Sequence, residues 1–133
     1  MTKYKAHGDY SLSHNNQTIF VEPVGAMNAE AGLALVADIL ILAKSLSVPQ
    51  WALCIDARRW ILGTPEFQEK TKAGIEGLIA HGLTRTAYVL ELESVQHYQV
   101  ANMMPVAQGY KRRYFPEKEA ALEWLASQGF DSE

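Results

Sequence analysis

The sequence is poor in cysteine and has no excess of positive charge. Its 133 residues include one cysteine, Cys54, and the formal net charge is -3, from 12 basic and 15 acidic side chains. One cysteine cannot build a disulfide framework, which favours a reducing compartment. The acidic balance gives no general attraction to nucleic acid or to anionic lipid, so nucleic acid is not expected as a partner and lipid contact must be local.

The residues that catalysis requires do not occur in recognisable groups. No two histidines stand at the spacing of metal ligands, and none lies beside a carboxylate cluster, so no metal site is expected. Cys54 lies within an apolar run and is interpreted as a buried, unreactive thiol. We therefore expect a protein that is not an enzyme and that uses no cofactor.

Length and composition predict a single domain over residues 1–133. With 48% hydrophobic residues, the chain can build one well-packed core, but it is too short for two ordinary domains. The first residues, Met1 to Lys5, carry neither the apolar run nor the cleavage site of a secretory signal. This predicts a cytoplasmic protein, and peripheral contact with the inner face of the membrane stays open.

Hydrophobic periodicity predicts strands that alternate with helices. Strands are expected at 10–14, 18–24, 51–56, 86–90 and 111–115, and helices at 28–47, 64–81, 94–104 and 116–128. The turn residues at 15–17 join the first two strands in a hairpin, and Pro23 should lie at a strand end or on a sheet edge.

This order of elements predicts an α/β fold. The hairpin enters a mixed, mostly parallel sheet, and helices pack on the sheet. Because the strand Trp51–Asp56 is apolar on both faces, it should lie inside the sheet. The charged strand at 111–115 should be an edge.

The helix expected after Asn28 is more apolar than packing on one face of a sheet requires. Most of its apolar side chains, Leu33 among them, fall within half the circumference, whereas Ile41 lies near the polar side marked by Asp38. Three interpretations stay open: ordinary core, a surface for a homodimer or protein partner, or the wall of an apolar ligand cavity. The candidate residues for such a wall or dimer surface are Leu35, Ile39, Ile41 and Leu42.

The segment 57–63 is predicted to be a loop and contains the strongest candidate site. A pair of arginines stands beside the apolar run Trp60-Ile61-Leu62, a combination typical of bilayer interfaces and lipid head groups. In one interpretation Trp60 and Leu62 fold over the core as a cap. In the other, the apolar run is a mobile lid over a cavity or inserts into a bilayer, and the arginines contact an anionic head group. The candidate contact residues are Arg58, Arg59, Trp60, Ile61, Leu62 and Phe67.

Several short sequence segments, in their order and spacing, resemble the STAS family of sulfate-transporter and anti-sigma-factor-antagonist domains, and specifically its SpoIIAA-like branch. These segments are Gly63-Thr64-Pro65-Glu66, the run from Leu83 to Val89, Arg113-Tyr114-Phe115, and the run from Glu119 to Leu125. The resemblance covers nearly the whole chain and implies the SpoIIAA-like fold. It also implies a regulatory role in protein interaction.

The resemblance ends at the position that regulatory STAS domains use as a switch. Those domains carry a phosphorylated serine at the start of the helix after the central strand. Here that position reads Thr64-Pro65-Glu66-Phe67 and contains no serine, so phosphorylation is not expected. Thr64 is interpreted as a helix cap.

Two functions stay open at this point. In the first, the protein is a non-catalytic binder of an apolar small molecule or lipid that associates reversibly with a membrane surface. In the second, it is a regulatory protein-protein interaction module of the anti-sigma-factor-antagonist type without the phosphorylatable serine. Its partner would then be another protein or a second copy in a weak homodimer.

Overall fold

The computed structural model describes residues 9–103, 105 and 107–130. Its elements are β1 (Asp9–His14), β2 (Thr18–Met27), α1 (Ala29–Ser45), β3 (Trp51–Asp56), β4 (Trp60–Gly63), α2 (Pro65–Ala80), β5 (Leu83–Val89), α3 (Val95–Met103), β6 (Lys111–Phe115) and α4 (Lys118–Ser127). Strands and helices therefore alternate as predicted, with β4 as an additional strand.

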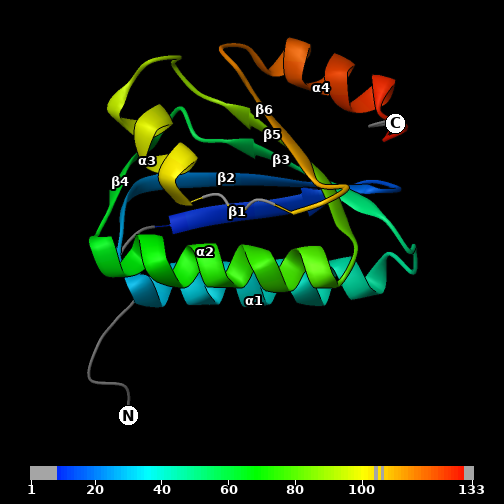
Figure 1. The fold of residues 1–133 in the computed structure, drawn as a ribbon, viewed down its shortest axis with the longest axis horizontal. Coiled ribbons are helices and arrows are strands. Elements are labelled where there is room, and N and C mark those ends of the chain that lie inside the picture. The colour runs from blue at the N-terminus through cyan, green and yellow to red at the C-terminus, as the bar shows by residue number, and fades with distance from the viewer. Residues whose placement is uncertain (1–8, 104, 106, 131–133) are drawn as a thin grey trace.

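The strands form one mixed sheet in the order β1-β2-β3-β5-β6, and β4 pairs with β2 beside this path. β1 runs antiparallel to β2, and the other pairs are parallel. Helices α1 and α2 lie side by side on one face of the sheet, and α4 covers the opposite face (Figure 1). The predicted α/β fold, with β3 inside the sheet and β6 at an edge, is confirmed.

The prediction of a loop over 57–63 was wrong for its second half, which forms β4. β2 is ten residues long, and its pairing with β3 ends at Val21. The rest of β2 offers a free parallel edge, where Gly25 pairs with Trp60 and Met27 with Gly63. Unpaired backbone groups along an extended strand favour such an addition.

Pro23 was predicted at a strand end or sheet edge, but it lies inside β2, where it pairs with Tyr10 of β1. It stands between Val21, the last residue to pair with β3, and Gly25, the first to pair with β4. Because the parallel ladder is interrupted there, a residue without an N–H is tolerated.

Side-chain caps begin three of the helices, and the cap at Thr64 confirms the prediction from the sequence. The Asn28 side chain accepts from Ala31 N at 3.0 Å before α1, and Thr64 Oγ1 accepts from Phe67 N at 3.0 Å before α2. Ser94 Oγ accepts from His97 N at 3.1 Å before α3. Each cap satisfies a backbone N–H that has no partner within its helix.

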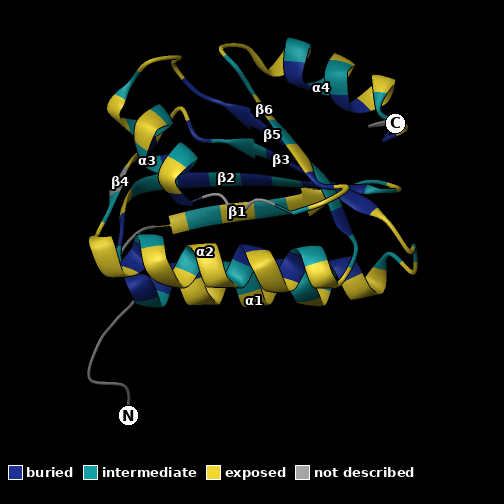
Figure 2. Ribbon diagram, viewed as in Figure 1, coloured by how far each residue is buried: buried dark blue, intermediate teal, exposed yellow. Residues whose placement is uncertain are grey.

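The core has two layers, one on each face of the sheet. The larger layer lies against α1 and α2, and the smaller one lies against α4 and contains Cys54. The inner strands β3 and β5 are largely buried, whereas the edge strands β1 and β6 and the outer faces of the helices α1 and α2 are more exposed (Figure 2). Burial raises the pKa of the Cys54 thiol to about 11, so the thiolate is a minor species at neutral pH.

The buried stripe of α1 differs from the prediction at Leu33, which is 50% exposed. α1 packs against α2 at Gly32, where an added Cβ would lie only 2.9 Å from Phe67 Cδ1 and from Thr71 Oγ1. This close approach turns Ala31, Gly32 and Ile39 inward and leaves Leu33 outside. Ile41, on the side expected to be polar, is 69% exposed.

Candidate functional site

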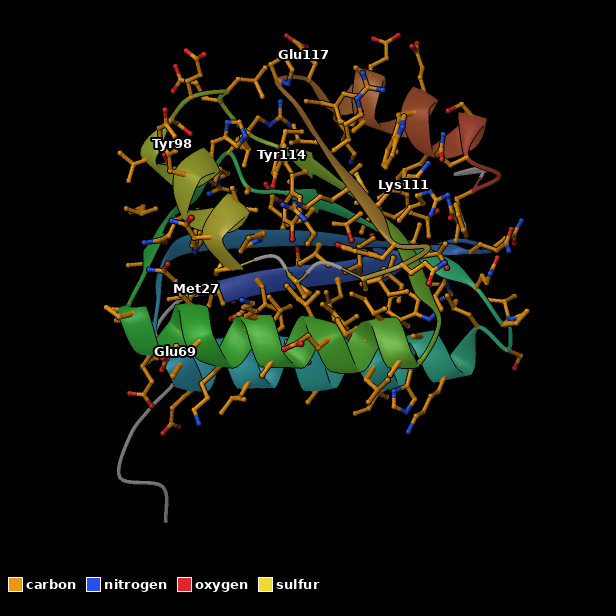
Figure 3. The ribbon with its side chains drawn as sticks, viewed as in Figure 1. Met27, Glu69, Tyr98, Lys111, Tyr114 and Glu117 are labelled. Atoms are coloured by element: carbon orange, nitrogen blue, oxygen red, sulfur yellow. The ribbon has the colours of Figure 1, made fainter. Side chains whose placement is uncertain are left out.

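An apolar cavity of about 70 Å³ lies between the sheet and the helices α1, α2 and α3. Its walls come from β2, β3, β4 and β5 on one side and from the three helices on the other. Met27, one of the lining residues, is labelled in Figure 3 at the end of β2 next to α2. The side chains in the lining are apolar except for Trp60, Thr71 and Tyr88, which each carry one polar atom.

The structure brings four of the predicted site residues together around this cavity. They are Leu35 and Ile39 of α1, Trp60 of β4 and Phe67 of α2. The other candidates do not line it: Ile41 is exposed, Leu42 is partly buried against the core, and Arg58, Arg59 and Ile61 lie outside the lining. The side chain of Leu62 lies outside the described part of the chain.

Trp60 is part of the core and is only 3% exposed. Its ring centroid lies 6.0 Å from that of Phe67, and the two rings are tilted by 35°. Trp60 thus occupies the position that the cap interpretation gives it, and a cavity lies behind it.

Two polar atoms in the cavity wall are buried without a hydrogen-bond partner among the described residues. They are the indole Nε1 of Trp60 and Oγ1 of Thr71. A buried polar group without a partner costs about 1–3 kcal/mol, so native proteins rarely keep one without a reason. The sequence analysis missed Thr71; the available signal was a hydroxyl on the apolar face of α2, one turn after Phe67.

Two glycines fix the position of the Phe67 ring. A Cβ on Gly32 of α1 would crowd the ring from one element, and a Cβ on Gly63 of β4 would overlap it from another. Only residues without a side chain permit such an approach. The ring is therefore held between α1 and β4, and it forms part of the cavity wall.

The two arginines of segment 57–63 differ in their surroundings. Arg58 Nε donates to Asp56 Oδ1 at 2.9 Å, and its Nη2 donates to Asp56 Oδ2 at 2.6 Å, so its charge is compensated in a forked ion pair. Hydrogen bonding from Arg58 holds the pKa of Asp56 below its usual value. Arg59 is 67% exposed, and its ion pair with Glu22 is long, at 4.0 Å. Ile61, two residues on, is 55% exposed.

The described residues hold no group of three or more His, Cys, Asp or Glu side chains that could bind a metal ion. Among the same residues, no helix combines the length and the apolar character that crossing a membrane requires.

A solved structure shows the same fold. It is an uncharacterized protein of the DUF3478 family with a SpoIIAA-like fold from Shewanella loihica PV-4; the match covers 94% of this chain and 98% of that one, with a TM-score of 0.63 and 15% identity. No protein-family model and no curated protein matches the chain. At this identity the likeness speaks for the fold, and the predicted SpoIIAA-like fold is confirmed.

Proposed function

We propose that the protein is a non-catalytic binding module for an apolar small molecule or lipid. The observation that carries this function is the cavity, because its lining is apolar apart from three residues and it contains no charged side chain. An apolar hollow with a few placed polar groups is the usual form of a small-molecule site. A SpoIIAA-like fold provides the scaffold, since the cavity lies between its sheet and its helices.

The volume of the cavity limits what it holds. At about 70 Å³ it is smaller than the roughly 150 Å³ cavity that accepts a benzene ring. A small apolar group fits with minor side-chain movement, whereas a long acyl chain requires outward movement of part of the wall.

Two exposed side chains next to the cavity wall support contact with a membrane surface. Arg59 and Ile61 flank the buried Trp60 in sequence, and both are more than half exposed. A cation beside an exposed aliphatic side chain suits the interface of an anionic bilayer. Reversible contact of Arg59 and Ile61 with a bilayer would bring the cavity wall close to the membrane, which would supply the apolar ligand.

Filling the cavity tests the binding function. Val100 of α3 is buried in the lining, so Val100→Phe places a ring in the cavity. Val95→Phe adds the same atoms at a position of the same helix that is 64% exposed. Xenon, an apolar atom small enough for a cavity of this size, should bind to wild type and to Val95→Phe in xenon NMR, but not to Val100→Phe. Equal binding to all three proteins would remove the cavity as the site.

A protein-interaction module is the second candidate, and the exposure of Leu33 and Ile41 on α1 favours it. Exposed apolar side chains on one helix are typical of interaction surfaces. If this face forms a homodimer, Ile41→Glu should convert dimer to monomer and leave the circular dichroism unchanged. Light scattering that finds wild type monomeric at high concentration would exclude the homodimer.

A further inference from the structure

The cavity wall contains a donor that no described residue uses. Trp60 lines the cavity and is only 3% exposed, and its indole Nε1 is buried without a hydrogen-bond partner among the described residues. Thr71 also lines the cavity, and its hydroxyl oxygen is likewise buried without a partner among those residues. Buried donors in folded proteins are almost always paired, with protein, with water or with a ligand. Two of them in one small cavity point to an occupant with a polar atom.

Both atoms belong to side chains next to Phe67. The Trp60 ring packs on Phe67 with centroids 6.0 Å apart. Thr71 lies one helical turn after Phe67, and its Oγ1 and Phe67 Cδ1 are each 2.9 Å from the position that a Cβ on Gly32 would take. The two side chains that carry these polar atoms therefore both lie next to one ring of the cavity wall.

The rest of the lining decides the charge of the occupant. No Lys, Arg, His, Asp or Glu side chain lines the cavity. Burial raises the pKa of Tyr88 well above its usual value, so this residue contributes a neutral phenol. An ionised carboxylate or ammonium would be buried here without a counter-charge, which is strongly unfavourable.

We propose that the cavity binds an apolar molecule with one neutral oxygen, a hydroxyl or a carbonyl, which accepts a hydrogen bond from the Trp60 indole and contacts the Thr71 hydroxyl. This ligand chemistry rests on the proposed function and deepens it. The indole can only donate, whereas the threonine hydroxyl can donate or accept. A ketone oxygen can therefore accept from either group, and an alcohol can also donate to Thr71.

Four probes with one short chain length, chosen to suit the small cavity, test the chemistry: butane, butan-1-ol, butan-2-one and butanoate, each titrated at neutral pH with binding followed by NMR. Thr71→Val removes the hydroxyl at constant shape, and Trp60→Phe removes the indole N–H. The affinity for butan-1-ol should fall roughly tenfold in Thr71→Val, and the affinity for butane should stay within about twofold. Thr71→Val decides the outcome by itself if Trp60→Phe does not fold.

Thr18→Val is the matched control. Thr18 is a fully buried threonine whose hydroxyl also has no partner among the described residues, but it lies outside the cavity lining. Thr18→Val should therefore leave the affinity for all four probes unchanged. A loss of butan-1-ol affinity in this variant equal to that in Thr71→Val would mean that the effect is general, and would overturn the inference.

The indole N–H resonances give a direct readout of the hydrogen bond. The chain has three tryptophans. Butan-1-ol should move the Trp60 indole proton downfield, whereas Trp51, which already donates to His81 O at 2.9 Å, should not respond. Equal affinity losses for butane and butan-1-ol in Thr71→Val, or tighter binding of butanoate than of butan-1-ol, would overturn the neutral-oxygen chemistry. If no probe shifts any resonance, the binding function itself fails.

Discussion

The side-chain amide of Gln99 pairs with both backbone groups of Gly63. Its Oε1 accepts from Gly63 N at 2.7 Å, and its Nε2 donates to Gly63 O at 3.1 Å. The amide thus occupies the place of a neighbouring strand on the outer edge of β4, and it joins α3 to β4. Because Trp60 of β4 and Val100 of α3 both line the cavity, this link holds two parts of its wall together.

Removing this amide should loosen the wall. Gln99→Ala leaves the N–H and C=O of Gly63 without partners at a partly buried site, so the free energy of unfolding should fall by about 1–3 kcal/mol. Gln96→Ala is the control on the same helix, because Gln96 makes one longer bond, 3.4 Å, to Trp60 O. Urea denaturation should show a clearly smaller loss for Gln96→Ala; equal losses would contradict a specific role for the Gln99 amide.

The two glycines Gly63 and Gly77 should respond to alanine in opposite directions. A Cβ at Gly63 would overlap the Phe67 ring, so Gly63→Ala should destabilise the protein by about 1–3 kcal/mol. A Cβ at Gly77 would meet nothing within 4 Å, and this glycine lies inside α2. Gly77→Ala should therefore stabilise the protein by about 0.5–1 kcal/mol. Thermal melts of both variants test this, and a neutral Gly63→Ala would show that Phe67 moves freely.

The sequence predicts those parts of the fold that depend on local signals. Asn28 and Thr64 are caps that act within one turn, and an apolar run such as Trp51–Asp56 belongs in a sheet interior whatever surrounds it. β4 has no such signal. Its four residues form a strand only because β2 extends beyond β3 and offers a free edge, which is a property of a distant segment.

The candidate site was predictable only in part, for the same reason. The excess of apolar side chains in α1 indicated Ile39 as a wall residue, and the apolar run around position 60 indicated Trp60. That both residues line the same cavity depends on how α1 packs on α2. Gly32 sets that packing by allowing Phe67 and Thr71 to approach closely. No periodicity in α2 distinguishes the hydroxyl of Thr71 from an ordinary half-buried polar group.

Alkaline pH should weaken a contact between β1 and α1. Burial, with the hydrogen bond to Asp38, raises the pKa of Tyr10 to about 12 from 10.0, and its hydroxyl donates to Asp38 Oδ2 at 2.6 Å. The folded state therefore holds this proton more tightly than the unfolded state, and the stabilisation is complete below pH 10 and lost as the pH rises to about 12.

Tyr10→Phe measures this contribution. The variant should be less stable than wild type by about 1 kcal/mol at neutral pH, the usual net value of a partly exposed hydrogen bond to a charged group. The difference should shrink between pH 10 and 12. Tyr98→Phe, at a position that is 65% exposed on α3, is the control and should match wild type at neutral pH. A Tyr10→Phe difference that stays constant with pH would contradict the assignment.

The exposed pair Arg59 and Ile61 should govern any contact with anionic vesicles. Arg58 is already paired with Asp56, so Arg59 is the cation of this segment with the weaker ion pair. One cation near an anionic surface contributes about 1 kcal/mol, so Arg59→Gln should weaken binding to phosphatidylglycerol vesicles roughly fivefold. Ile61→Asp should weaken it at least as much, because it removes an apolar contact and adds a repelled charge.

Arg113→Gln is the control, because Arg113 is exposed on the edge strand β6 at the other side of the sheet. This substitution changes the net charge by the same amount as Arg59→Gln, and it should have little effect on co-sedimentation with the vesicles. If all three variants bind like wild type, this segment does not contact the membrane, and the cavity must take its ligand from solution.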